Sequence, residues 1–271
     1  MIIADMHTHS SNSHDSECSI EDMIASQLKK GTTIMAVTDH FDVAWNEIKD
    51  IFTSVLNSNK QAKELSVKYK DNFKVLAGIE VSESFWNSEA AEKGLNMAQY
   101  DVIIGSVHCV RYKDLTMAYA QLDFSSLSEY DLCGFMNAYF DDMLTMLSSL
   151  DFDILAHLTC PLRYIIGKYR LKFDISPYMS KIEKVLKIII ERKIALEINT
   201  SSYDTLSDFM PTTEIIRKYY ELGGRMITLG SDAHCAENAS KCFDQAINTI
   251  KSIGFDSIYY FENRNPQKII I

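Results

Sequence analysis

Proline, glycine and paired cysteines are scarce in this chain. It holds only 4 prolines and 10 glycines in 271 residues, and no stretch has the composition of a linker or a low-complexity segment. The 6 cysteines are scattered without any Cys-x-x-Cys pair, which is typical of reduced thiols in a cytosolic protein. We therefore expect a single domain over residues 1–271 and a cytoplasmic location.

The sequence also lacks an excess of basic residues and a long uninterrupted apolar run. Lys and Arg total 27 against 37 Asp and Glu, so the average electric field repels phosphate backbones and a nucleic-acid partner is not expected. Apolar runs such as "VLKIIIERKIAL" are broken by charges, and the N-terminus shows no basic region followed by an apolar stretch. We expect neither a signal peptide nor a membrane association.

What the chain does contain is an alternation of short apolar runs with longer amphipathic segments. Hydrophobic residues make up 46% of the sequence, which is enough for one substantial core. Predicted strands cover residues 2–7, 32–40, 73–81, 101–110, 151–157, 194–200 and 225–234, with a further candidate at 257–261. Predicted helices cover residues 20–30, 46–70, 87–98, 128–150, 177–193, 212–223 and 238–253.

Two of these helices have legible boundary signals. Ser19 and Asp22 form a capping-box pattern, and Gly31 is placed to end the helix that follows. Ser176 before Pro177 predicts an N-cap and a first-turn proline. Repeated strand–helix units predict a parallel sheet, and with at least seven units a closed barrel of (βα)7 or (βα)8 type is more economical than an open doubly wound sheet.

The 7 histidines are distributed in step with this alternation. Each lies at or just beyond the C-terminal end of a predicted strand, and two carboxylates, Glu80 and Asp232, occupy equivalent places. The histidines are His7, His9, His14, His40, His108, His157 and His234. Because the C-terminal ends of the strands of a parallel barrel lie on one face, these side chains are expected to converge there.

Imidazole and carboxylate together suit zinc, manganese or iron. About six histidines with several acids exceed the three protein ligands of a catalytic zinc, so the sequence predicts two or three divalent transition-metal ions. Clustered ions activate water and stabilise phosphoryl transfer. Each histidine alone would be an ordinary loop residue, and it is the whole set that favours metal binding. In the first loop either His14 or Asp15 is a possible ligand.

The ordered motifs "DMHTHSSNSHDS", "VTDH", "GIE", "GSVH", "DILAHL" and "GSDAH" resemble the polymerase-and-histidinol-phosphatase (PHP) superfamily of metal phosphoesterases. Further stretches, "DILAHLTCPLRYI" and "LEINTS" among them, are most similar to its monofunctional histidinol-phosphatase branch. The resemblance covers nearly the whole chain. It implies an α/β fold, a distorted (βα)7 TIM-like barrel with up to three metal ions.

The resemblance also implies which residues would bind each ion. The first ion would take His7, His9, Glu80 and Asp232; the second Glu80, His108 and His157; the third Asp15, His40 and His234. The family places its loop ligand six residues after the second motif histidine, which favours Asp15 over His14.

Four further residues receive roles beside the ligands. Arg163 matches an arginine that the family uses on the substrate phosphate, so it is expected to act in catalysis and substrate binding without touching a metal ligand. Its alternative is an ordinary surface arginine. Asn199, on one strand face with Glu197, is expected to border the pocket. Asp5 and Asp39 are expected to orient ligating imidazoles.

The implied activity is hydrolysis of L-histidinol phosphate to L-histidinol and phosphate, in histidine biosynthesis, by attack of a metal-bridging hydroxide. Relatives often follow "NTSG" with a further basic residue, whereas this chain reads "NTSSYDTLSD", with Tyr203 and Asp204 in that place. Another small phosphate ester, a nucleotide or phosphotyrosine therefore stays open as substrate. So does a non-catalytic metal-binding module. The sequence leaves the native metal and the oligomeric state undetermined.

Overall fold

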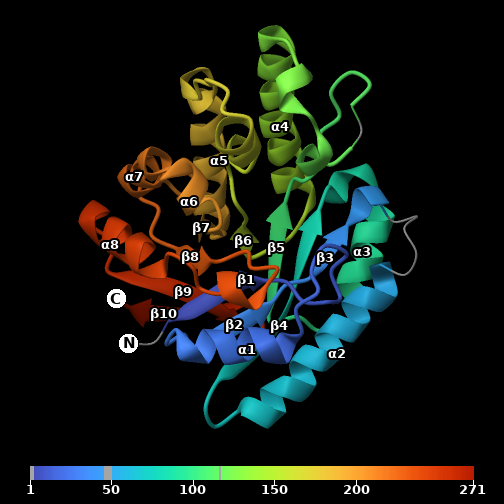
Figure 1. Cartoon of the computed structure of the whole chain (residues 1–271), viewed down its shortest axis with the longest axis vertical. Coiled ribbons are helices and arrows are strands. Elements are labelled where there is room, and N and C mark those ends of the chain that lie inside the picture. The colour runs from blue at the N-terminus through green and yellow to red at the C-terminus, as the bar shows by residue number, and fades with distance from the viewer. Residues whose placement is uncertain (1–2, 46–50, 116) are drawn as a thin grey trace.

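The computed structural model describes residues 3–45, 51–115 and 117–271, and a parallel sheet lies at its centre (Figure 1). Its strands neighbour one another in the order β1, β2, β4, β5, β6, β7, β8. Their bounds are β1 Ala4–Thr8, β2 Ile34–Val37, β4 Lys74–Ser82, β5 Val102–Ser106, β6 Ile154–Leu155, β7 Ala195–Asn199 and β8 Ile227–Gly230. A short strand, β3 (His40–Asp42), continues the line of β2 along β4.

The sheet curves round until its last strand meets its first. The Asp232 N–H donates to the His7 carbonyl at 2.8 Å, and the His9 N–H donates to the Ala233 carbonyl at 2.9 Å. These bonds join β1 to the segment directly after β8, so the sheet is nearly closed. The expected α/β barrel is confirmed, and several strands end earlier than predicted, which leaves their histidines in the loops at the barrel mouth.

Helices surround this sheet (Figure 1). Their bounds are α1 Ile20–Lys29, α2 Ile51–Tyr69, α3 Ser88–Asn96, α4 Glu129–Ser149, α5 Met179–Arg192, α6 Tyr203–Leu206, α7 Thr213–Glu221 and α8 Phe243–Ile253. Most match the predicted helices within a few residues, although 46–50 of the predicted 46–70 helix lies outside the described residues. None of the helices in the described ranges has the length and apolar character needed to cross a membrane.

The capping box before α1 is confirmed. The Ser19 hydroxyl accepts the Asp22 N–H at 3.1 Å and donates to its carboxylate at 2.6 Å, and Gly31 ends the helix with φ +81°. The predicted cap at Ser176 is wrong. Ser176 lies inside a 3-10 turn, and its N–H donates to the Asp174 carboxylate at 2.9 Å. Ile175 precedes this turn and Tyr178 precedes α5, and neither side chain caps the helix, while Pro177 does lie in the first turn.

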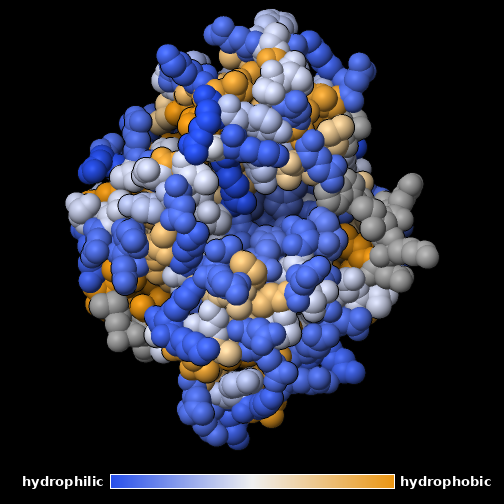
Figure 2. All heavy atoms as spheres, viewed as in Figure 1, coloured by the Kyte–Doolittle hydropathy of each residue, from blue (hydrophilic) through white to orange (hydrophobic). Residues whose placement is uncertain are grey.

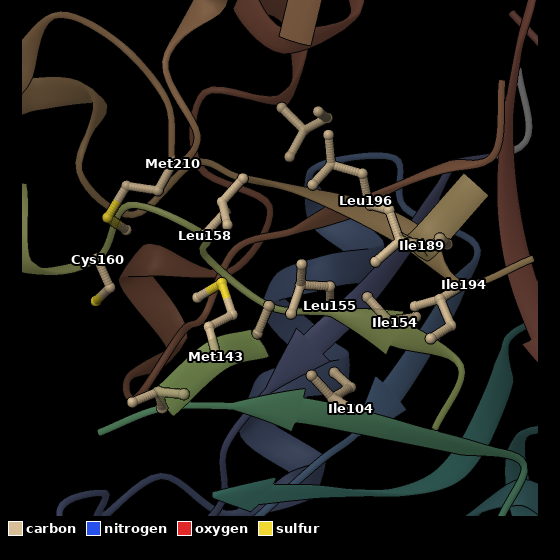
Figure 3. Close-up of a cluster of buried hydrophobic side chains, with 14 of the residues drawn as sticks. Ile104, Met143, Ile154, Leu155, Leu158, Cys160, Ile189, Ile194, Leu196 and Met210 are labelled. Atoms are coloured by element: carbon tan, nitrogen blue, oxygen red, sulfur yellow. The ribbon is translucent and has the colours of Figure 1, made fainter. Parts of the chain in front are cut away.

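The apolar strand residues form two buried layers. The larger joins the barrel to α4 and α5, where Met143 and Ile189 pack over Ile104, Leu155 and Leu196 (Figure 3). All five side chains are fully buried. The smaller layer lies between the sheet and the first two helices and includes Met23, Met35 and Val75. These layers hold the strands side by side, so that their C-terminal ends present one shared mouth.

An antiparallel hairpin, β9 (Ser257–Glu262) and β10 (Asn265–Ile270), closes the chain. The sequence predicted only its first strand, because the residues of β10 are mostly polar and exposed. Its turn residues, Asn263 and Arg264, both have positive φ, as a type I′ turn requires. Their N–H groups donate to Asp101, directly before β5, so the hairpin is attached at the end of the barrel opposite to the histidines.

Arg264 secures this attachment. Its Nε donates to the Asp153 carboxylate at 2.6 Å, and the same oxygen accepts the Ile103 N–H at 2.8 Å. Asp153 lies directly before β6 and is almost fully buried, so burial raises the pKa of its carboxyl above the usual value. The guanidinium therefore compensates a carboxylate that water barely reaches.

Arg264→Ala should lower the free energy of unfolding by about 1–3 kcal/mol, because the buried carboxylate loses its charged donor. Urea denaturation followed by circular dichroism measures this. Lys268→Ala is the matched control, since its 3.4 Å pair with exposed Asp256 lies on the surface of the same hairpin, and it should cost less than about 0.5 kcal/mol. Equal losses in the two variants would contradict a specific role for Arg264.

Candidate metal centre

The histidines of the barrel mouth lie against one another although they come from distant parts of the sequence. The ring centroid of His9 is 4.1 Å from that of His40 and 4.1 Å from that of His234. His7 and His157 lie beside them, with centroids 5.7 Å apart. The middle of the face shown in Figure 2 is hollowed and lined by hydrophilic residues. The predicted convergence of strand-end side chains is therefore observed.

The Glu80 carboxylate occupies the centre of this cluster and is fully buried. Its Oε1 lies 3.0 Å from His157 Nε2 and 3.2 Å from His108 Nε2. Its Oε2 lies 2.8 Å from His40 Nδ1 and 3.4 Å from His7 Nε2. One carboxylate thus faces imidazoles on both sides, which is the geometry that a bridging ligand needs.

The loop after β1 brings Asp15 into the cluster. Its Oδ2 lies 3.1 Å from His234 Nε2 and 3.5 Å from His40 Nε2. His14 lines the pocket that opens over this cluster, with its ring centroid 5.5 Å from that of His40 and its Nδ1 4.0 Å from Asp42 Oδ2. Of the two loop candidates, Asp15 is the one that meets a pair of histidines.

Several buried atoms of this cluster make no hydrogen bond of suitable angle within the described residues: His7 Nε2, His9 Nε2, His40 Nδ1 and Glu80 Oε2. Two of them, His40 Nδ1 and Glu80 Oε2, nevertheless lie 2.8 Å apart. A buried polar atom without a partner costs about 1–3 kcal/mol. These four atoms belong to side chains that face one another, so a cation between them would satisfy them together. The residues present therefore fit a metal centre.

Distances between ring nitrogens point the same way. His40 Nε2 lies 3.4 Å from His234 Nε2, and His108 Nε2 lies 3.4 Å from His157 Nε2. Two nitrogens that bind one tetrahedral zinc at about 2.1 Å are themselves about 3.4 Å apart. Both pairs thus have the spacing of two ligands on one ion.

Four groups of three side chains could each hold an ion, because the ligand atoms within each group lie within 4.8 Å of one another. They are His9, His40 and His234; His7, His9 and Asp232; His7, Glu80 and His157; and His40, Glu80 and His108. Together with Asp15, these groups contain all nine side chains expected to bind metal. The cluster offers more sites than one ion can use.

Neighbouring charges set the pKa of each group in the cluster. Burial lowers the pKa of His7, but the charges of Glu197, Glu80 and Asp232 outweigh it and hold this pKa well above the usual value. Burial, with the charges of the neighbouring imidazoles, holds the pKa of His9 well below its usual value. His9 therefore keeps a neutral ring, which is the form that binds a metal.

Glu197 positions His7, a role that the sequence did not reveal. The His7 Nδ1–H donates to Glu197 Oε1 at 2.7 Å, which leaves Nε2 toward Glu80. A Cβ on Gly230 would lie 2.0 Å from that same Glu197 oxygen and 2.8 Å from the His7 Cβ. Only glycine leaves room there for the carboxylate to reach the ring. The alternation in "LEIN" predicted that Glu197 shares a strand face with Asn199, but it did not indicate which of the two contacts the histidines.

Asp42 positions His108 in the same manner. The His108 Nδ1–H donates to Asp42 Oδ1 at 2.9 Å, which also accepts the Ser82 hydroxyl at 2.6 Å. The charge of His40 and the contact with His108 outweigh burial and lower the pKa of Asp42 to about 2. The sequence analysis missed Asp42, although its spacing two residues after His40 on a strand was a usable signal.

The expected roles of Asp39 and Asp5 need adjustment. Asp39 acts through Ser13, whose hydroxyl donates to it at 2.6 Å and therefore accepts from the His9 Nδ1–H at 3.3 Å. Asp5 makes no contact with an imidazole ring in the described part of the chain. Its carboxylate instead accepts from the side-chain amide of Gln27 in α1 at 2.6 Å.

Three residues around the cluster have left-handed backbone conformations that non-glycine residues rarely adopt. The φ angles are 22° at His157, 50° at Asp232 and 43° at Glu83. Such conformations cost of order 1–3 kcal/mol each and persist where the surrounding contacts impose them. Their gathering at one strand-end face is typical of a functional site.

Arg163 lies on the wall of a pocket of about 90 Å³ that opens over the cluster, beside Tyr119 and Tyr164. It donates to the Ser201 hydroxyl and, at 2.9 Å, to Asp232 Oδ2. The expectation that it touches no candidate ligand is therefore wrong, because the turn after β6 carries it across to the end of β8. Its buried Nε has no hydrogen-bond partner among the described residues.

Asn199 does not border this pocket as expected. It is fully buried, and its amide donates to Glu197 at 3.2 Å and to Asp232 at 3.3 Å. Its side-chain oxygen accepts from Ser201. These bonds make Asn199 a support for Asp232 in place of a direct contact with substrate.

Comparison with known proteins agrees with this geometry. The PHP domain model matches residues 5–201. A probable histidinol-phosphatase from Clostridium acetobutylicum is 30% identical over 267 residues, which cover 97% of this chain and 98% of the relative. A histidinol-phosphatase from Lactococcus lactis is 24% identical, over 97% of this chain and 96% of the relative.

Solved structures share the fold. The crystal structure of histidinol phosphate phosphatase from Lactococcus lactis, complexed with zinc, L-histidinol and phosphate, superposes with a TM-score of 0.75 at 21% identity, over 98% of this chain and 99% of the other. A putative histidinol phosphatase from Listeria monocytogenes gives a TM-score of 0.71 at 16% identity, over 89% and 99%. The resemblance seen in the sequence motifs is confirmed, and the chain belongs to the PHP domain family.

Proposed function

We propose that the protein is a metal-dependent phosphomonoesterase that hydrolyses L-histidinol phosphate to L-histidinol and phosphate. The observation that carries the proposal is the buried Glu80 carboxylate, with imidazoles on both sides and Arg163 on the wall of the pocket above. Its family and its relatives, which are named as histidinol-phosphatases, make it a hydrolase of phosphoric monoesters.

The nine clustered side chains would hold two or three divalent ions of zinc, manganese or iron. His7, His9, Glu80 and Asp232 would hold the first, Glu80, His108 and His157 the second, and Asp15, His40 and His234 the third. When bound, such ions activate water and neutralise charge on a phosphoryl group.

The chain's other residues prepare this chemistry by fixing ring orientation. Glu197 and Asp42 accept the Nδ1–H of His7 and His108, so that Nε2 of each ring faces Glu80. Ser13 does the same for His9. The imidazole lone pairs are thus directed toward the ions before any ion binds.

Arg163 is the substrate-phosphate ligand in this proposal. A guanidinium binds phosphate oxygens through several N–H groups at fixed angles, and the Nε–H of Arg163 is buried and unused by the described residues. Asp232 and Ser201 hold the other side of the same guanidinium. A phosphoryl group bound there would lie directly over the metal cluster.

Size and composition of the pocket favour a small ester. Its volume is about 90 Å³, and Ala118, Tyr119 and Tyr164 offer it an apolar wall for the carbon skeleton of the alcohol. Asp204, in the place where relatives often carry a basic residue, pairs with Lys241 at 2.5 Å. Arg163 therefore carries the phosphate contact without a second cation from that loop.

A panel of phosphate esters tests the substrate. Protein loaded with zinc or manganese is assayed against L-histidinol phosphate, a nucleotide, a sugar phosphate and phosphotyrosine. We expect kcat/KM for L-histidinol phosphate to exceed the others by at least about 10-fold. Equal values would reject this substrate while leaving a phosphomonoesterase. No hydrolysis of any ester by fully loaded protein would point to a metal-binding module.

Glu80→Gln should nearly abolish hydrolysis and reduce the metal content from two or three ions per chain to at most one, because the carboxylate faces imidazoles on both sides. The loss should exceed the roughly 10–100-fold that residues supporting a ligand cost. Elemental analysis and the hydrolysis assay measure both effects, with circular dichroism to verify folding. Glu92→Gln, on an exposed helix face, is the control. Wild-type metal content in Glu80→Gln would rule out a bridging role.

Arg163→Ala should lower kcat/KM by about one to two orders of magnitude, since hydrogen bonds to charged groups contribute about 1.5–3 kcal/mol. Arg163→Lys keeps the positive charge but loses the planar guanidinium with its several N–H donors. Its kcat/KM should therefore lie between that of the wild type and that of the alanine variant. Because Arg163 also donates to Asp232, the metal content of each variant is measured at the same time. Unaltered kcat/KM at unaltered metal content would remove Arg163 from substrate binding.

A further inference from the structure

Glu83 lies three residues beyond Glu80, just after the end of β4, and the proposed chemistry does not use it. Its side chain is fully buried. Its backbone is left-handed, with φ 43° and ψ 35°, a conformation that is unfavourable for a residue with a Cβ. A buried carboxyl group on a strained backbone persists only where its contacts compensate both costs.

Its carboxylate binds the neighbouring strand end. Oε1 accepts the backbone N–H of His108 and, at 2.8 Å, that of Cys109, while Oε2 lies 2.7 Å from the Ser82 hydroxyl oxygen. The pairing of β4 with β5 ends at the Ser82–Ser106 pair. Glu83 therefore replaces the missing backbone pairing with its own side chain, two residues past the end of the ladder.

His108 is consequently held at two places. Glu83 fixes its backbone, and Asp42 accepts its ring Nδ1–H at 2.9 Å. The remaining ring nitrogen, Nε2, lies 3.2 Å from Glu80 Oε1 and 3.4 Å from His157 Nε2. A shift of the His108 backbone would change both of these distances.

The same backbone also fixes the pocket wall. The His108 carbonyl accepts the Tyr119 N–H at 3.0 Å, and Cys109 forms an isolated antiparallel bridge with Ala118. Ala118 and Tyr119 line the pocket. The two residues that Glu83 holds therefore connect the metal cluster to the surface that contacts the substrate.

We infer that Glu83 is a positioning residue that places His108 for metal binding and residues 118–120 for substrate binding. The inference rests on the proposed function in treating His108 as a metal ligand. If the inference is right, loss of the Glu83 carboxylate weakens metal binding through His108 and raises KM through residues 118–120.

Hydrogen exchange of the chelator-treated protein tests the backbone contact without metal or substrate. Glu83→Ala should speed amide exchange at His108 and Cys109, because their N–H groups lose their acceptor. Glu83→Gln keeps an oxygen for both N–H groups and an amide donor for Ser82, so exchange should stay near that of wild type. Glu83→Asp shortens the side chain by one methylene, so its amide exchange should lie between that of the alanine and glutamine variants. It replaces the alanine variant if that variant does not fold. Exposed Glu92→Ala is the control.

Zinc affinity and hydrolysis then test the consequence. Glu83→Ala should bind zinc about 10–100-fold more weakly and show a raised KM, and Glu83→Gln should restore both. Unchanged amide exchange in Glu83→Ala and Glu83→Asp would overturn the inference. Equal damage in the glutamine and alanine variants would also overturn it, because charge and not hydrogen bonding would then matter. A failure of the proposed function would appear instead in wild-type protein, as absent zinc binding or hydrolysis.

Discussion

The barrel mouth is organised around one interaction, that of the buried Glu80 carboxylate with the imidazoles on both of its sides. This carboxylate is fully buried, and a buried charge is costly unless opposite charge surrounds it. Burial alone would raise its pKa, but the charges of His108, His7 and His40 outweigh burial and hold this pKa well below the usual value. Imidazoles can supply that charge as protonated rings, or as neutral ligands that hold metal ions beside the carboxylate. Metal binding and the integrity of the barrel mouth are therefore coupled.

The surrounding residues keep the imidazole rings directed at this carboxylate. Glu197 and Asp42 fix two rings from behind, and Gly230 leaves the space that Glu197 needs. Glu83 extends the same principle to the backbone of His108. Global stability is supplied elsewhere, by the apolar layers under α4 and α5 and by the hairpin below the barrel. Because the stabilising apolar layers lie away from the barrel mouth, the mouth can contain strained and charged groups that would destabilise a hydrophobic core.

Much of this was predictable because it depends on periodicity and on order along the chain. The strand–helix alternation predicted the barrel, and the position of each histidine at a strand end predicted a single cluster. The role of Asp5 was not predictable because the partners of its carboxylate, Gln27 and Ser231, come from distant segments that meet only in the fold. The contact of Arg163 with Asp232 and the burial of Asn199 depend on how distant strands and turns meet, which no local pattern encodes. The strand β10 has too few apolar residues to be recognised from its sequence.

The most direct test of the central claim is a crystal structure of the metal-loaded protein, with anomalous scattering recorded at the absorption edge of the bound metal. The account predicts an ion on each side of Glu80, with each carboxylate oxygen about 2.0–2.2 Å from its own ion. His157 and His108 would complete one side, and His7 the other. Ions in the barrel mouth without any bond to Glu80 would contradict the account.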